Sequence, residues 1–290
     1  MQNCLKNESR IAAERGDAAI IFNIVFLAWT YKIYLTQIRK NIIITEVFTA
    51  RKNHMPEVFG WEHLTYLAVC IVIAAAATFF ILKYAKAEKA LSIVMRAVGG
   101  ALFACILWNR ISLCIKNDNP MALLPDTFCG ISSLTLSLAM LIGKRDNKVF
   151  HFICYLGFVG GLIAIIYPDF IGQADSVFYP PTISGLLHHT VMVYAIILML
   201  LTKYFVPTIK KWYILPIGLC CVMTFGIFEI TALGFNDAMQ IFTPLLPDTT
   251  FTWWFCGALL LPFSFIVMLA FDYFLVWRKK KATAQGFDEQ

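Results

Sequence analysis

The chain has 290 residues, of which 59% are hydrophobic and 15% aromatic, whereas only 14% carry a charge. A soluble globular domain carries about 25% charged residues, so this composition excludes a disordered chain, a nucleic-acid-binding module and an ordinary cytosolic enzyme. A mean hydropathy of +0.71 and a formal net charge of +6 indicate instead a multi-pass membrane protein with basic cytoplasmic loops. Nine cysteines, an odd number and mostly within apolar runs, argue against a disulfide framework.

The first 54 residues form a segment of their own. Residues 17–35 are apolar enough for an extra N-terminal hydrophobic helix, although Asn23 and Lys32 interrupt the run. If this helix crossed the membrane, the basic residues after it would lie outside, against the pattern of the rest of the chain. The hypothesis is that residues 1–54 are an N-terminal extension or precede the true start at Met55, and that residues 55–290 form the membrane domain.

Seven later segments are each long and apolar enough to cross a bilayer, which takes about 20 residues. They are 64–82, 91–113, 122–142, 149–167, 183–206, 214–236 and 252–277. The predicted fold class is therefore all-α, a polytopic transmembrane bundle of seven core helices. Alternate connections and the tail carry thirteen Lys and Arg residues, whereas the opposite side carries only Arg110 and Lys116. Because basic residues stay in the cytoplasm, the N-terminus of this core is expected outside and the C-terminus inside.

Polar side chains gather at one depth in the outer half of the predicted bundle. At 1.5 Å per residue, Cys129 and Glu229 lie roughly 10 Å below the outer ends of their spans, and His188 and His189 about 8 Å below theirs. The outer rim adds His63 and Asn109. Because polar groups within a bilayer face a bundle interior or a cavity, these residues predict a cavity in the outer leaflet.

Helical spacing selects the residues that share a face. Asp126, Cys129 and Ser133 stand at positions i, i+3 and i+7, which form one stripe. Glu229 and Asn236 are also seven residues apart on one predicted span. We therefore expect both sets to contribute to the cavity, with Asp126, Ser133, Glu229, Asn236, His63 and Asn109 in binding roles.

The combination of Cys129 with His188 or His189 indicates nucleophilic catalysis. A neighbouring histidine can turn a cysteine thiol into the reactive thiolate and then serve as general acid. Adjacent helical residues point about 100° apart, so one of the two histidines faces inward, and the spacing leaves open which one. Asp126, Glu229 or Asn236 could orient the imidazole. From spacing alone, a packing role for the cysteine and structural hydrogen bonds for the histidines are favoured over catalysis.

A zinc site is the weaker interpretation of the same polar residues. His63, His188 and His189 with Glu62 or Glu229 supply suitable ligand types. However, two adjacent helical residues do not easily reach one ion, and the chain has no HExxH or CxxC spacing. We therefore predict no metal and no cofactor.

The segment Leu124-Pro125-Asp126-Thr127-Phe128-Cys129 resembles the Leu-Pro-x-x-x-Cys signature of YwaF-type bacterial integral membrane proteins. That group is related to the transmembrane protein 164 family of animals. Three further elements are similar and stand in the same order: Trp61-Glu62-His63, the His188-His189 pair, and Asn236 to Pro244. The resemblance covers roughly residues 57–277, and it departs from the family pattern at Thr127 and Asp237.

The resemblance implies acyl transfer among phospholipids, with Cys129 as the nucleophile that holds the acyl group and His188 or His189 as the base. The expected function is thus that of an intramembrane lipid acyltransferase or acyl hydrolase acting in the outer leaflet of a bacterial cell membrane. Its partner would be membrane lipid, and no nucleic acid is expected. The alternative is a non-enzymatic seven-helix sensor, or a transporter of a small molecule or ion, in which the polar cluster binds a ligand.

Overall fold

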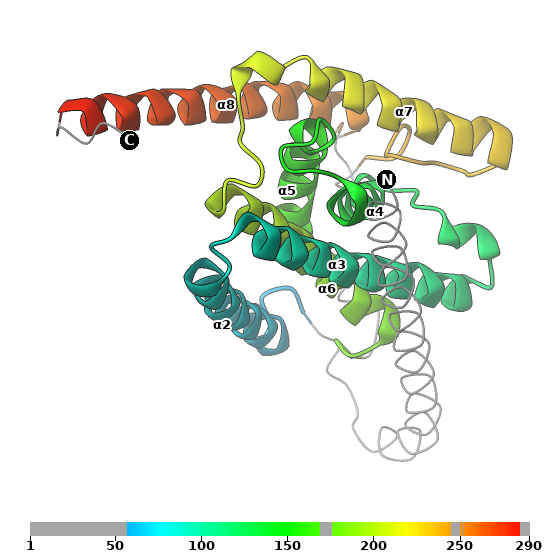
Figure 1. Cartoon of the computed structure of the whole chain (residues 1–290). Helices are drawn as coiled ribbons and strands as arrows, with labels where there is room; N and C mark the ends of the chain where they lie inside the picture. The colour runs from blue at the N-terminus through cyan, green and yellow to red at the C-terminus, as the bar shows by residue number, and fades with distance from the viewer. Residues whose placement is uncertain (1–56, 169–175, 245–249, 251, 285–290) are drawn as a thin grey trace, which may run out of the picture. The chain divides into compact units, whose positions relative to one another are not determined.

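The structure, a computed structural model, describes residues 57–168, 176–244, 250 and 252–284. All of these residues belong to one compact unit, Met55–Gln290. The predicted N-terminal extension, residues 1–54, lies outside the described residues. Within them the chain is helical throughout (Figure 1). The α-helices are α2 (Trp61–Tyr84), α3 (Glu88–Asn117), α4 (Phe128–Ile142), α5 (Phe150–Ile166), α6 (Pro180–Leu201), α7 (Ile214–Leu233) and α8 (Trp253–Ala284), with 3-10 helices η1 (Pro120–Leu123) and η3 (Ile209–Lys211).

The predicted all-α membrane bundle is confirmed. Each of the seven predicted spans contains one α-helix, and five of these helices are long and apolar enough to cross a membrane. The other two, α4 with 15 residues and α5 with 17, are apolar but shorter than the predicted spans.

The third predicted span, 122–142, is wrong at its beginning. The 3-10 helix η1 starts at Pro120, the chain then extends, and α4 begins only at Phe128. Thr127 caps α4, because its side chain accepts a 3.1 Å hydrogen bond from the backbone N–H of Gly130. Cys129 is therefore in the first turn of α4 and not seven residues along a helix, and Asp126 precedes the helix.

The sixth predicted span, 214–236, is wrong at its end. Helix α7 stops at Leu233, and Gly234 follows with φ of 75°, a left-handed conformation that glycine adopts without strain. The N–H of Phe235 bonds to the carbonyl oxygen of Glu229 at 3.1 Å, which closes the helix end. Glu229 therefore lies one turn from the end of α7, and Asn236, beyond the helix, does not share a helical face with it.

Helix α3 lies at the centre of the packing. It contacts α6 and α4 most extensively, and α5 packs against both of these helices. The buried core includes Met95 and Leu102 of α3, Leu136 of α4 and Ile196 of α6. Glycine allows the closest approach of α3 and α4, since a Cβ on Gly99 would lie 2.7 Å from that of Met140.

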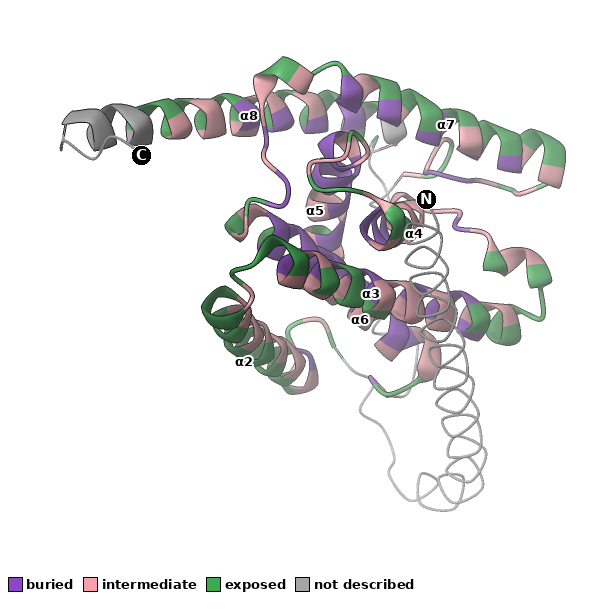
Figure 2. Ribbon diagram, viewed as in Figure 1, coloured by how far each residue is buried: buried purple, intermediate pink, exposed green. Residues whose placement is uncertain are grey.

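Two helices expose most of their apolar surface. Figure 2 shows exposed and intermediate residues along nearly all of α2 and most of the described part of α8, whereas α7 is buried along one side and exposed along the other. In α2 the single buried residue is His63. In a membrane these faces contact lipid, which costs apolar side chains nothing, so exposure here does not indicate a soluble binding surface.

Two of the connections that the charge pattern assigns to the cytoplasm contact each other. The segment 143–149 packs on the segment 203–211: Asp146 N–H donates to the Tyr204 carbonyl at 2.9 Å, and Arg145 Nε donates to that of Lys203 at 3.0 Å. The Asp146 carboxylate also accepts from Lys211 Nζ and lies 2.9 Å from His151 Nε2. Burial alone would raise the pKa of Asp146, but the Lys211 hydrogen bond and the nearby His151 outweigh it and hold that pKa below its ordinary value.

Candidate functional site

Arg110 of α3 lies at the centre of the polar cluster. Only 7% of the residue is exposed. Its Nη1 donates to the Leu124 carbonyl at 3.2 Å and to Asp126 Oδ1 at 2.9 Å, which holds the extended segment before α4 against α3. The guanidinium also interacts electrostatically with Cys129, His188, His189 and Glu229. Its Nε is buried without a hydrogen-bond partner among the described residues.

Asn109, the neighbour of Arg110, joins α3 to the beginning of α6. Its Nδ2 donates to the Pro181 carbonyl at 3.3 Å and to Ser184 Oγ at 3.2 Å. Ser184 in turn donates to the Pro180 carbonyl at 2.5 Å. Pro180 suits the first position of a helix, where no N–H is needed. The predicted binding residue Asn109 thus fixes the end of α6 that leads into the cluster.

His188 is held by Ser133 across the contact of α4 and α6. His188 Nδ1 and Ser133 Oγ lie 3.0 Å apart, and both residues are buried. Ser133 Oγ donates to Met192 Sδ at 3.2 Å. Which of Ser133 and His188 donates depends on the tautomer of the ring, because a thioether is a weaker acceptor than an imidazole nitrogen. The ring of His189 lies beside it, with centroids 3.9 Å apart.

Cys129 packs on α5. A Cβ placed on Gly160 would lie 3.0 Å from Cys129 Sγ, so the thiol occupies the space that this glycine leaves. In the described part of the chain Cys129 makes no hydrogen bond to His188 or His189. Cys129 and Ser133 are four residues apart and share a face of α4, so the sulfur lies about one helical turn from the Ser133–His188 bond.

Glu229 is a buried carboxyl group on α7. It is fully buried, and neither carboxyl oxygen has a hydrogen-bond partner among the residues described. It interacts electrostatically with Asp126 and Arg110. The structure therefore brings Glu229 toward the cluster, as its sequence position suggested, but from the last turn of α7.

Asn236 does not join the cluster, and its neighbour Asp237 is the ordering residue of that segment. Asn236 is exposed. The Asp237 carboxylate accepts four backbone hydrogen bonds, from the N–H groups of Ala238, Ile241, Phe242 and Thr243, at 2.8 to 3.1 Å. The loop so formed packs on α7 and donates from Met239 N–H to the Asp126 carbonyl at 2.8 Å.

His63 has a structural role of its own at the start of α2. Its Nδ1 accepts from the Phe59 N–H at 3.1 Å, so the other nitrogen, Nε2, donates to the Ile165 carbonyl at 2.9 Å. Both ring nitrogens are thus occupied in joining α2 to the end of α5. Among the described residues, no three His, Cys, Asp or Glu side chains gather closely enough to hold a metal ion.

A polar cavity of about 210 Å³ lies beside the cluster, between α3 and α6. Its polar lining consists of Asn109, Arg110, Lys116, Thr127, Thr182, His188 and His189. Both histidines reach it, so the structure does not single out one by position, although only His188 bonds to Ser133. Cys129 does not line it.

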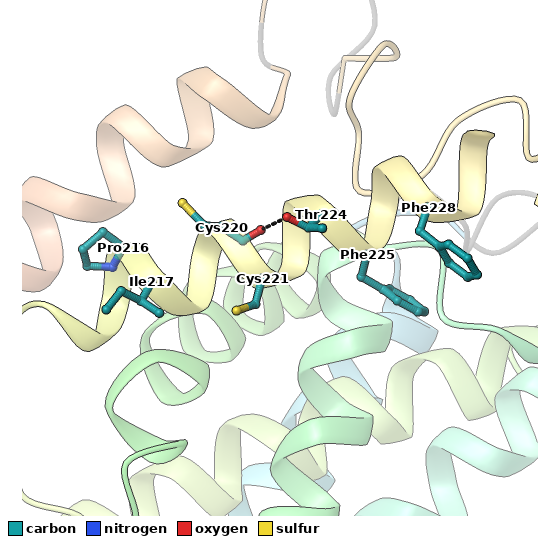
Figure 3. A pocket seen from close by; sticks show the side chains of 7 residues that line it. All are labelled: Pro216, Ile217, Cys220, Cys221, Thr224, Phe225 and Phe228. Carbon is teal, nitrogen blue, oxygen red and sulfur yellow. Dashed lines mark hydrogen bonds between the residues drawn. The ribbon is translucent and has the colours of Figure 1, made fainter. Parts of the chain in front are cut away.

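A larger hollow of about 750 Å³ lies on α7 and is apolar. Figure 3 shows that its lining, from Pro216 to Phe228, belongs to this one helix, and that Thr224 donates to the Cys220 carbonyl of its own helix. None of the predicted site residues lines it. It is an exposed face of α7 that suits a lipid chain.

Gly160→Ala tests the position of Cys129. The new methyl group would meet Sγ at 3.0 Å, and overpacking of this kind costs about 1–3 kcal/mol of unfolding free energy. Gly100→Ala is the matched control, because its Cβ would meet only Leu141 Cδ2, at 3.8 Å. We expect a lower melting temperature for Gly160→Ala than for Gly100→Ala in detergent, and equal values would contradict the described packing.

Arg110 is a residue of the site to which the sequence analysis gave no role. The sequence places it at the outer rim beside Asn109, among the few basic residues of the outer side, where a charged residue at a helix end is usually exposed. The signal was its place within the apolar run of α3, since an ionisable side chain there faces a partner or a cavity. Asp237 carried a weaker signal, because aspartate before a turn often bonds to the backbone that follows.

The model of the TMEM164 family matches residues 58–271 of the chain. The search of the curated proteins and that of the solved structures found no match.

Proposed function

The chain belongs to the TMEM164 family, and we propose that it is an intramembrane lipid acyltransferase or acyl hydrolase, because its resemblance to that family implies acyl transfer. In this proposal Cys129 is the nucleophile, His188 is the base, and membrane lipid is the substrate. The finer assignments, a YwaF-type protein of a bacterial cell membrane with its cluster in the outer leaflet, belong to the same proposal.

The observation that carries this proposal is the Ser133–His188 hydrogen bond, one helical turn from Cys129. It gives His188 a fixed ring orientation, and the proposal takes the tautomer with the proton on Nδ1, which leaves the lone pair of Nε2 to act as a general base. Catalytic hydrogen bonds often form only once substrate is bound, so a cysteine and a histidine one turn apart are compatible with such a pair. The Arg110 guanidinium places a positive charge near Cys129.

The proposed reaction has two steps. His188 Nε2 takes the thiol proton, the Cys129 sulfur attacks the ester carbonyl carbon of a lipid, and the bond from carbon to the alcohol oxygen breaks. The leaving alkoxide receives the proton from His188, which leaves a thioester on Cys129 and a lysolipid. In the second step the hydroxyl of another lipid, or water, gives its proton to His188 and attacks the thioester carbonyl carbon. The carbon–sulfur bond breaks, an ester or a free fatty acid is released, and the sulfur takes the proton back from His188.

Detection of the thioester tests this function. The purified full chain would be incubated in detergent with a long-chain acyl p-nitrophenyl ester and analysed by intact-protein mass spectrometry. We expect an adduct of one acyl chain that hydroxylamine at neutral pH removes, and no such adduct on Cys129→Ala. Cys154→Ala is the control, because this cysteine is buried in the core away from the polar cluster. An equal adduct on Cys129→Ala, or none on wild type, would reject Cys129 as the nucleophile.

One observation favours the alternative, a non-enzymatic sensor or transporter. The chain is extended between η1 and α4, and Thr127 at the end of this segment lines the polar cavity. Transporters bind ligands at such interruptions of helical structure. Ligand binding without any thioester in the experiment above would support this alternative.

A further inference from the structure

The cavity between α3 and α6 has the size of a small polar group. Its volume of about 210 Å³ corresponds to about seven water molecules at 30 Å³ each. Pockets for drug-sized ligands begin at about 300 Å³. An acyl chain therefore does not fit inside, whereas a small ion or the head of a lipid does.

Arg110 lines this cavity and keeps hydrogen-bond donors that no described residue uses. Of its five N–H groups, those on Nη1 donate to the Leu124 carbonyl and to Asp126, and the guanidinium makes no other hydrogen bond to the described residues. The side chain is 91% buried, and Nε has no partner in the described part of the chain. A guanidinium with free donors on one edge is shaped to bind two oxygens of one anion.

The charge around the cavity is positive. Arg110 and Lys116 both line it, and Asn109, Leu113 and Lys116 follow at i, i+4 and i+7 on one face of α3. The nearby acidic groups are Asp126, which is 40% exposed and bonds to Nη1, and the buried Glu229 of α7. Neither of them lines the cavity, so the charged side chains of its lining are the two cations, which a ligand of negative charge would neutralise.

The beginning of α4 adds to this positive potential. Thr127, the N-cap of α4, lines the cavity, and the guanidinium Nη2 lies 3.3 Å from the position of a Cβ on Gly130 in the first turn. The N-terminal end of a helix carries a partial positive charge and exposes backbone N–H groups. Arginine, lysine and a helix N-terminus together are the usual environment of a bound phosphate.

We propose that this cavity binds a phosphate group, with Arg110 as the buried residue that holds it and Lys116 as the cation beside it. The phosphate would be that of the lipid whose ester Cys129 attacks, and in this respect the inference rests on the proposed function. The phosphate, fixed between α3 and α6, then sets which ester of the lipid reaches Cys129, while the acyl chains remain in the bilayer.

Binding of inorganic phosphate tests the site directly. Radiolabelled phosphate would be titrated onto the purified full chain in an uncharged detergent by equilibrium dialysis. We expect saturable binding to one site, weakened at least about tenfold by Arg110→Gln and by Lys116→Gln. Arg96→Gln is the matched control, an exposed arginine of the same helix that does not line the cavity, and it should bind as wild type. No saturable binding, or the same loss in all three variants, would overturn the proposal.

The double variant Arg110→Gln/Asp126→Asn covers the case in which Arg110→Gln does not fold. It removes both partners of the ion pair, so no lone carboxylate is left at the contact of α3 and α4. A monodisperse double variant that still binds phosphate as tightly as wild type would overturn the role of Arg110.

Nanodiscs separate the two sources of phosphate. Phosphatidylglycerol is expected to displace labelled phosphate, whereas a galactolipid without phosphorus should not. If neither displaces it, the site takes free phosphate and its link to the lipid is rejected.

Failure of this inference and failure of the enzyme are distinguishable. Phosphate binding by a chain that never forms the Cys129 thioester would reject acyl transfer alone, and a thioester without phosphate binding would reject this site alone.

Discussion

Removing the imidazole of His188, as in His188→Ala, is expected to slow acylation of Cys129 by about 10²- to 10⁴-fold, the usual contribution of a general base. His189→Ala should slow it far less, because Ser133 bonds to His188 and not to its neighbour. The measurement is the burst of p-nitrophenol released from the acyl ester by each variant. A larger loss in His189→Ala would show that His189 is the base.

Ser133→Ala separates an orienting hydrogen bond from a packing role. Loss of the bond that holds His188 Nδ1 should slow acylation about tenfold and change the pH dependence of its rate, since the ring no longer has a favoured tautomer. Ser133→Thr keeps the hydroxyl and should restore the pH profile. Ser137→Ala is the control, because Ser137 bonds only to the backbone of its own helix. If the pH profile of Ser133→Ala equals that of wild type, Ser133 has a packing role and does not orient His188.

Asp146→Asn is expected to destabilise the chain by about 2–3 kcal/mol near neutral pH. The change removes the negative charge from bonds to Lys211 and His151, and charge-assisted bonds contribute about 1.5–3 kcal/mol each, reduced here because a side chain 37% exposed is partly screened. Thermal unfolding in detergent measures the effect. Asp118→Asn is the control, an exposed aspartate in a left-handed conformation that asparagine also adopts, and it should unfold as wild type.

The pH dependence of this effect follows from the lowered pKa of Asp146. A carboxyl whose pKa is lower in the folded state stabilises the fold above its unfolded pKa, about 3.9, and loses that contribution as the pH falls through the folded value. Wild type and Asp146→Asn should therefore differ fully at pH 6–7 and converge in strong acid. A difference that grows below pH 4 would contradict the arrangement described.

Hydropathy predicted the helices well and their ends poorly. The residues before Cys129 include the apolar run 121–124, so the average over a span hides the extended segment that Pro125 and the Thr127 cap produce. At the end of α7, Gly234 is one residue in an otherwise apolar run, and a hydropathy average does not reveal its positive φ. Both misplaced ends lie at the polar cluster, which explains why the positions of Cys129 and Glu229 relative to the ends of their helices were wrong.

The sequence predicted most of the residues of the site, but not which of them bond to one another. Ser133 and His188 were both named, yet their bond depends on how α4 and α6 face each other, which helical spacing within each segment does not determine. The role of Arg110 was not predicted because its partners, the Leu124 carbonyl and Asp126, reach it from the extended segment before α4. Asn236 was included because α7 was taken to be longer than it is.

The loose attachment of α2 has a consequence for the order of membrane insertion. Its polar ties run to Ile165 and Thr190, which follow their partners His63 and Tyr66 by 102 and 124 residues. During synthesis α2 therefore enters the bilayer long before the helices that it will join exist, and it waits there surrounded by lipid. Its mean hydropathy of 2.4 is the highest of the five long apolar helices. That value lets α2 stay inserted without a partner, so assembly can end with α2 docking onto a bundle already formed by α3 to α6.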